Sequence, residues 1–208
     1  MLPIFFILAS SGCGALWNLA FSDANQTEIA RNGGIESVVS AMRQHAADAG
    51  VQEEGCGALW NLAATKANES LIGSSGGVDV VIQAMKSHRS ICGVSEQGLG
   101  ALRNLAANDN NRMLIAKAGG VDTILQCVGA HLDNAGVAEE GCGALYSLAF
   151  TDTNKVRRRA PTDLAASRRN DIAFLVQLSI SAHGGIPIVV SVMRKHLMHM
   201  GVQEQVAD

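Results

Sequence analysis

Apolar residues recur along this chain with the spacing of amphipathic helices. Within 78–88 they follow the i, i+3, i+4, i+7 pattern that gathers side chains on one helical face, at Val78, Val81, Ile82 and Met85. A short segment at 68–74 precedes this stretch, and a longer helical pattern at 94–107 follows it after a loop. This part of the chain is therefore predicted to form three helices, and no stretch shows the alternation typical of a β-strand.

The three-helix pattern repeats every 43 residues. The stretch beginning at Gly12 reads GCGALWNLA, and the same nine residues begin again at Gly55. Related stretches, GLGALRNLA from Gly98 and GCGALYSLA from Gly141, stand at the same interval. A fixed period of this size is typical of stacked repeat proteins, in which each unit covers the hydrophobic face of the next.

A pair of glycines recurs before each second helix. Glycine enters the left-handed region of backbone space without steric cost, so each pair is expected to make a sharp turn between two helices. The pairs are Gly33-Gly34, Gly76-Gly77, Gly119-Gly120 and Gly184-Gly185.

The period divides the chain into five units. We expect a partial repeat at 1–22, full repeats at 23–64, 65–107 and 108–150, and a last unit at 151–208 with a 22-residue insertion and a truncated third helix. Two interpretations of the irregular, Arg-rich part at 157–182 remain open. The segment is either a loop insertion or intron sequence translated in frame. Its change of composition favours the intron interpretation.

Neither end of the chain has the polar outer face of a capping repeat. We therefore expect a fragment of a longer array that self-associates through its uncapped ends.

Composition narrows the classes of function. The chain is 48% hydrophobic and carries a net charge of −3, which does not favour nucleic acid as a partner. Three of its five cysteines, Cys13, Cys56 and Cys142, occupy one repeat position. Helices in adjacent repeats pack about 10 Å apart, too far for a disulfide. We therefore expect these thiols to be buried. We also expect a cytoplasmic protein, and a nuclear location is compatible with the sequence. No stretch is long enough to span a membrane.

Histidines also recur with the repeat, near the ends of the second helices. Metal binding is disfavoured because equivalent positions lie a repeat apart, whereas imidazole suits the free carbonyls of a helix C-terminus. These residues are His45, His88, His131 and His196.

The glycines follow the repeat instead of forming a phosphate-binding loop. We therefore predict a protein that is not an enzyme and needs no cofactor or metal.

Three helices per unit, a Gly-Gly break and a long third helix ending in Asn-Leu-Ala resemble the armadillo repeat. The resemblance implies an all-α, right-handed armadillo-type solenoid with three helices per ~43-residue repeat. Armadillo proteins of the β-catenin and importin-α types line a groove with the third helix, and asparagines there hold an extended peptide. Asn18, Asn61 and Asn104 match that position, and Ser147 replaces the fourth. The importin-α pattern has tryptophan four residues earlier, where this chain has glycine.

The third helices supply the candidate partner-binding residues, which combine asparagines, bulky groups and glutamates. They are Trp17, Asn18, Glu53, Trp60, Asn61, Glu96, Arg103, Asn104, Glu139 and Tyr146. We predict a scaffold that binds a protein or an extended peptide along the concave third-helix groove. Three alternatives stay open: a non-catalytic structural region of a larger signalling protein, a transport or trafficking adaptor, and a solvated face whose tryptophans merely pack between neighbouring third helices.

Overall fold

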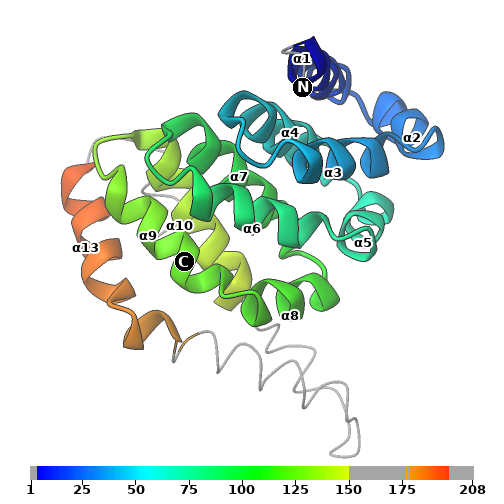
Figure 1. Cartoon of the computed structure of the whole chain (residues 1–208). Helices are drawn as coiled ribbons and strands as arrows, with labels where there is room; N and C mark the ends of the chain where they lie inside the picture. The colour runs from blue at the N-terminus through cyan, green and yellow to red at the C-terminus, as the bar shows by residue number, and fades with distance from the viewer. Residues whose placement is uncertain (1–3, 150–176, 178, 197–208) are drawn as a thin grey trace, which may run out of the picture.

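The computed structural model describes residues 4–149, 177 and 179–196, and side chains from residue 7 onward. Every regular element in this part of the chain is an α-helix, so the fold is all-α and repeat-like (Figure 1). The helices are α1 Ile4–Leu19, α2 Asp23–Arg31, α3 Gly34–Gln44, α4 Ala49–Leu62, α5 Lys66–Ser74, α6 Gly77–Ser87, α7 Cys92–Leu105, α8 Asp109–Lys117, α9 Gly120–Ala130, α10 Ala135–Ala149 and α13 Gly185–Lys195. The expected 22-residue insertion lies mostly outside the described residues, and so does the expected truncated third helix.

The Gly-Gly pairs make the turns that the sequence predicts. The first glycine of each pair has φ between 73° and 81°, the left-handed conformation that only glycine adopts without strain. The second glycine begins a helix and lies close to an isoleucine of the preceding helix, as Gly34 does to Ile29 and Gly77 to Ile72. A Cβ on either residue would overlap that isoleucine. The pair therefore fixes both the turn and the tight packing across it.

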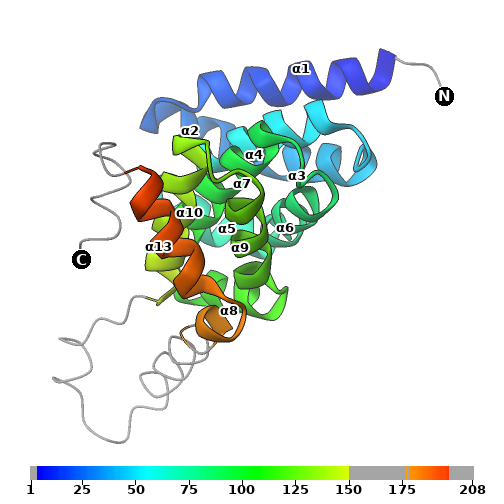
Figure 2. The ribbon, with the colours of Figure 1, turned by 90° about the vertical axis from the view of Figure 1, so that its left-hand side faces the viewer.

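The third helices α1, α4, α7 and α10 lie side by side in one row. The second helices α3, α6 and α9 each pack on the third helix of the same unit, and α13 packs on α9 (Figure 2). The core runs continuously between these layers. Within it, equivalent leucines from successive units are fully buried: Leu62, Leu105 and Leu148. Each unit thus covers the apolar flank of its neighbour.

Histidines join the second helices α6, α9 and α13 to the unit before each of them. The Nε2 atoms of His88, His131 and His196 lie 2.8 Å from the carbonyl oxygens of Ala46, Arg89 and Leu132. A carbonyl only accepts, so Nε2 carries the proton and donates in each case. The structural role predicted for these residues is confirmed, with one correction: the carbonyls belong to the preceding unit and not to the histidine's own helix.

The histidine contacts also show that the register resumes at α13. His88 and His131 each reach 42 residues back, whereas His196 reaches 64 residues back. The difference equals the predicted insertion of 22 residues. The last unit therefore docks on its predecessor as the regular repeats do.

Two basic residues of the second helices donate hydrogen bonds to the next unit along the chain. Arg43 donates through Nη2 to the carbonyl oxygen of Ser75 at 3.3 Å, and Lys86 donates through Nζ to that of Ala118 at 2.9 Å. Both acceptors are C-caps of first helices, where carbonyls lack an intrahelical partner and a positive charge is favourable. Helix α6 thus contacts the preceding unit through His88 and the following unit through Lys86.

The five cysteines are free thiols, and all but the half-buried Cys92 are buried. Burial raises the pKa of Cys13 and of Cys142 to about 11. This confirms the expectation that these residues act as small apolar groups in the core.

Within the described residues, no single helix has both the length and the apolar character of a membrane span. The bent pair α8 and α9, which meet at 73°, passes that test only when taken together.

Candidate partner-binding face

The ten residues predicted from the sequence lie on the four third helices. They are all half-buried or exposed, and the row of helices places them on neighbouring elements. We call them together the third-helix face: Trp17, Asn18, Glu53, Trp60, Asn61, Glu96, Arg103, Asn104, Glu139 and Tyr146. Their contacts within the molecule show how each side chain is held.

Three bulky residues of the face, Trp17, Trp60 and Arg103, each cover a glycine of the next third helix. A Cβ on Gly57 would lie 2.5 Å from ring atoms of Trp17, and a Cβ on Gly143 would lie 2.8 Å from the side chain of Arg103. Trp60 covers Gly100 in the same way. Glycine therefore stands where the importin-α pattern has tryptophan because the preceding unit's bulky group occupies that space. The tryptophans do pack between neighbouring third helices.

The asparagines also act between units. Asn61 donates through Nδ2 to the carbonyl oxygen of Trp17 at 3.0 Å, and Asn104 to that of Trp60 at 3.1 Å. These carbonyls belong to the last turns of α1 and α4, where helices leave acceptors unsatisfied. A primary amide has two N–H groups and one oxygen, so this bond uses only part of its capacity. The sequence did not indicate this internal bond.

Glutamates of the face lie at the N-termini of neighbouring third helices. The Glu53 carboxylate lies over Gly93, the second residue of α7, and the Glu96 carboxylate lies over Gly136, the second residue of α10. A negative charge is favourable at a helix N-terminus because of the free N–H groups and the helix dipole. Part of the acidic character of the face therefore stabilises the stack itself.

A second polar row, next to the predicted residues, was missed by the sequence analysis. It consists of Glu54, Gln97 and Glu140, which occupy one repeat position. Glu54 lies over Gly14, where a Cβ would be 2.6 Å from its Oε2. Burial raises the pKa of Glu54, and the adjacent Glu53 raises it further. The doubled glutamate at 53–54 was the available signal.

Glu140 forms the ion pair of this row. Its carboxylate lies 3.3 Å from Nη1 of Arg103, the residue that replaces tryptophan in this unit. Burial raises the pKa of Glu140, and the Arg103 guanidinium opposes that rise. Arg103 is thus held by a carboxylate of the next helix as well as by Gly143.

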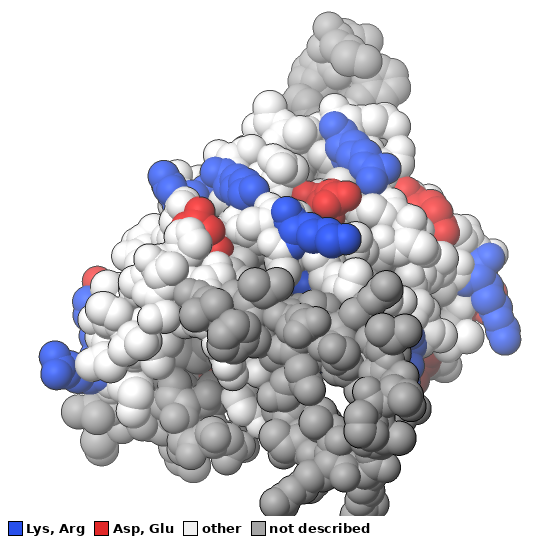
Figure 3. All heavy atoms as spheres, turned by 90° about the horizontal axis from the view of Figure 1, so that it is seen from below, with Lys and Arg blue, Asp and Glu red and all other residues white. Residues whose placement is uncertain are grey.

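The four third helices carry five glutamates and one arginine, a formal net charge of −4. Because Arg103 is already paired with Glu140, the charge left at this face is negative. The face of the molecule seen in Figure 3 differs, because basic and acidic side chains are interspersed there.

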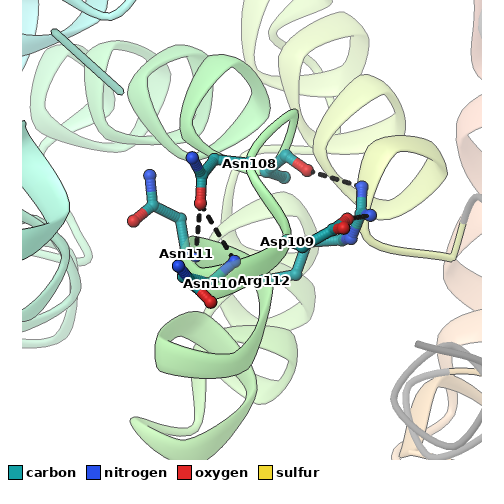
Figure 4. A network of polar contacts seen from close by, with 6 residues as sticks. Asn108, Asp109, Asn110, Asn111 and Arg112 are labelled. Carbon is teal, nitrogen blue, oxygen red and sulfur yellow. Dashed lines mark hydrogen bonds and ion pairs between the residues drawn. The ribbon is translucent and has the colours of Figure 1, made fainter. Parts of the chain in front are cut away.

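A polar cluster at the start of α8 is a set of helix caps. The Asn108 side chain accepts from the backbone N–H groups of Asn110 and Asn111 at 2.9 and 3.3 Å (Figure 4). Arg112 pairs with Asp109 and donates to the carbonyl oxygen of Ala106, the C-cap of α7, at 3.0 Å. The cluster closes the junction between α7 and α8 and resembles no arrangement for catalysis.

Other candidate sites are weak in the described part of the chain. No group of three or more His, Cys, Asp or Glu residues there could hold a metal ion. A hollow of about 250 Å³ lies between α3 and α6, with Met42, Val80 and Ala84 among its lining residues. It is smaller than most small-molecule sites, which begin near about 300 Å³.

Comparison with known proteins adds information on the fold alone. No protein-family model matches the sequence, and no curated protein matches it. Among solved structures, the chain is similar to an engineered protein whose crystal structure came from a structural genomics consortium. The identity is 21% and the TM-score 0.63, over 94% of this chain and 86% of the other. This likeness supports the all-helical arrangement.

Proposed function

We propose that this chain forms an armadillo-type solenoid, right-handed and with three helices per repeat, that binds another protein. The support is the recurrence of the same inter-unit contacts along α1, α4, α7 and α10, together with the armadillo-like motif that ends each of these helices. A rigid row of helices loses little conformational freedom on binding, which favours affinity.

The third-helix face is the proposed docking surface, and an extended basic segment is the proposed partner. The observation that carries this choice is charge: four helices side by side carry a net charge of −4 and a single, internally paired cation. Complementary charge steers association and excludes acidic partners. The half-buried rings of Trp17 and Trp60 supply apolar surface of the kind that dominates interface energies.

The internal contacts define what each residue contributes. Asn61 and Asn104 use one N–H in the stack, and the remaining amide groups hold the partner's main chain. Glu53 and Glu96 are placed at helix N-termini, so their carboxylates are oriented before a partner arrives. The face is therefore preorganised by the same contacts that stabilise the repeat.

Tryptophan fluorescence provides a direct test because both tryptophans of the chain lie on this face. Titration with extended Lys/Arg-rich peptides is expected to change the emission, whereas acidic peptides of equal length leave it unchanged. Neutralising three glutamates together, with Glu53→Gln, Glu96→Gln and Glu139→Gln, is expected to weaken binding about tenfold or more.

The matched control removes the same charge elsewhere. Glu36, Asp79 and Asp122 occupy the first turns of the second helices α3, α6 and α9. The triple variant Glu36→Gln, Asp79→Asn, Asp122→Asn changes the net charge equally and should retain binding. Equal losses in both triple variants, or equal binding of acidic and basic peptides, would contradict a specific role of the third-helix face.

A further inference from the structure

The hollow of about 250 Å³ between α3 and α6 has a counterpart one unit later, between α6 and α9. Successive second helices pack on one another in order, α3 on α6 and α6 on α9 (Figure 1). The residues that line the hollow include Met42, Ala46, Asp79, Gln83 and Ala84. The residues 43 positions later are Met85, Arg89, Asp122, Gln126 and Cys127. The largest difference between the two junctions is therefore alanine at 46 against arginine at 89.

Arg89 lies in the part of the second junction that corresponds to the hollow. Its Nη1 donates to Oε1 of Gln126 at 2.5 Å, and Gln126 donates through Nε2 to the Asp122 carboxylate at 2.7 Å. Burial raises the pKa of Cys127, and the Arg89 guanidinium opposes that rise, so the guanidinium lies near this thiol. Both residues that Arg89 approaches are thus counterparts of residues that line the hollow.

The backbone at positions 46 and 89 is held in the same way. The Nε2 atom of His88 donates to the carbonyl oxygen of Ala46, and that of His131 to the carbonyl oxygen of Arg89, at 2.8 Å in each case. A side chain at 46 therefore starts from the same place as the side chain at 89. The hollow is the space that an arginine at 46 would fill.

The charges around the hollow are compatible with a guanidinium. Arg43 lines the hollow, but it donates to the carbonyl oxygen of a C-cap in the next unit. Its counterpart Lys86 makes the same kind of bond and coexists with Arg89 at the second junction. Asp79 lines the hollow as well and supplies a negative charge.

We propose that the hollow between α3 and α6 binds an arginine side chain of a partner protein, in the position that Arg89 takes at the next junction. The aliphatic part of that arginine packs on the buried side chains of Met42 and Ala84. Its guanidinium donates to Oε1 of Gln83, with the Asp79 carboxylate beside it. Lysine is a poor substitute because it lacks the planar fork of donors. This site lies on the second helices and is independent of binding at the third-helix face.

Methyl NMR of the full chain with ¹³C-labelled methionine tests the proposal, because Met42 lines the hollow. The probe is the tripeptide acetyl-Gly-Arg-Gly-amide, titrated to about 10 mM because a single side chain supplies little affinity. The Met42 resonance, identified by its loss in Met42→Leu, is expected to shift and to saturate. Tripeptides with lysine, or with citrulline as the uncharged analogue of arginine, should bind about tenfold more weakly.

Substitutions at the two junctions provide the matched variants. Ala46→Arg supplies the arginine from the chain itself and should abolish the response. Ala47→Arg adds the same charge at the adjacent exposed position and should retain it. Gln83→Ala should weaken binding about tenfold, because it removes the acceptor for a charged donor. Arg89→Ala should open a second hollow, so that the methyl group of Met85 also responds to the arginine tripeptide.

Three results would overturn the proposal: an unshifted Met42 resonance in the wild-type protein, equal binding of the lysine or citrulline tripeptide, or a full response in Ala46→Arg. The methionine methyl group reports on the hollow, whereas tryptophan emission reports on the third-helix face. Failure of one proposal is therefore distinguishable from failure of the other.

Discussion

The indole ring of Trp60 lies against Gly100 of the next third helix, so closely that a Cβ on Gly100 would overlap ring atoms. The same pairing joins Trp17 to Gly57. The aromatic residue and the glycine of the repeated motif are thus two halves of one contact, formed between units.

Replacing Gly100 by alanine tests this contact. Alanine gains about 1 kcal/mol of helix propensity, yet the overlap with Trp60 should make Gly100→Ala destabilising by about 1–3 kcal/mol. Gly129→Ala is the control, because its Cβ would make only an ordinary contact, 4.0 Å from Ile188, and this variant should be neutral or slightly stabilising. Urea unfolding followed by circular dichroism measures both. A second substitution, Trp60→Ala, should restore part of the stability of Gly100→Ala; simple additivity would contradict direct contact.

The asparagine bonds predict a modest structural cost. Asn61→Ala removes the hydrogen bond to the Trp17 carbonyl oxygen and should lower the free energy of unfolding by about 0.5–1.5 kcal/mol. Asn18→Ala is the comparison, since Asn18 is exposed. Amide hydrogen exchange should increase at the end of α1 in Asn61→Ala. An unchanged exchange rate there would argue against the bond.

The sequence was sufficient for the parts of the fold that depend on local pattern. The apolar spacing of 78–88 predicted α6, and the paired glycines predicted four turns that the structure forms with positive φ. For His88, His131 and His196 the predicted structural role was correct, although their partners were not predicted. These predictions were correct because each of these features depends on residues within one helix or one turn.

The contacts between units could not be read from the period. The repeat is 43 residues, but Trp60 meets Gly100 and Glu53 meets Gly93, each 40 residues later. That stagger of about one turn depends on how neighbouring helices are shifted along their axes, which sequence spacing does not reveal. For the same reason, the sequence showed Gly100 only as a departure from the importin-α pattern. The structure shows that Gly100 is the packing partner of Trp60.

Glu54 predicts a stability that increases as the pH falls. Burial and the neighbouring Glu53 raise its pKa in the folded protein, so the folded state binds this proton more readily than the unfolded state does. The free energy of unfolding therefore gains from this group as the pH falls through the raised folded-state pKa, until the unfolded-state pKa is reached. Glutamine already occupies the equivalent position as Gln97. Glu54→Gln should be at least as stable as wild type at pH 7 and should lose this part of the pH dependence.

Chemical unfolding at pH 7 and at pH 5 measures that difference. Glu36→Gln provides the comparison, because Glu36 lies exposed on α3. If Glu54→Gln retains the full wild-type difference between the two pH values, another carboxylate is responsible, with Glu140 the next to test.

Alkylation should distinguish Cys92 from the other thiols. Cys92 is half-buried at the start of α7, whereas Cys13, Cys56, Cys127 and Cys142 are buried. The reacting species is the thiolate. Burial raises the pKa of Cys92, and Glu96 and Glu53 raise it further. We expect one slow modification under native conditions, faster as the pH rises, followed by the remaining four only on unfolding. Mass spectrometry should locate the first adduct on Cys92, and Cys92→Ala should remove it. Equally fast labelling of Cys13 would show instead that α1 detaches readily from α4.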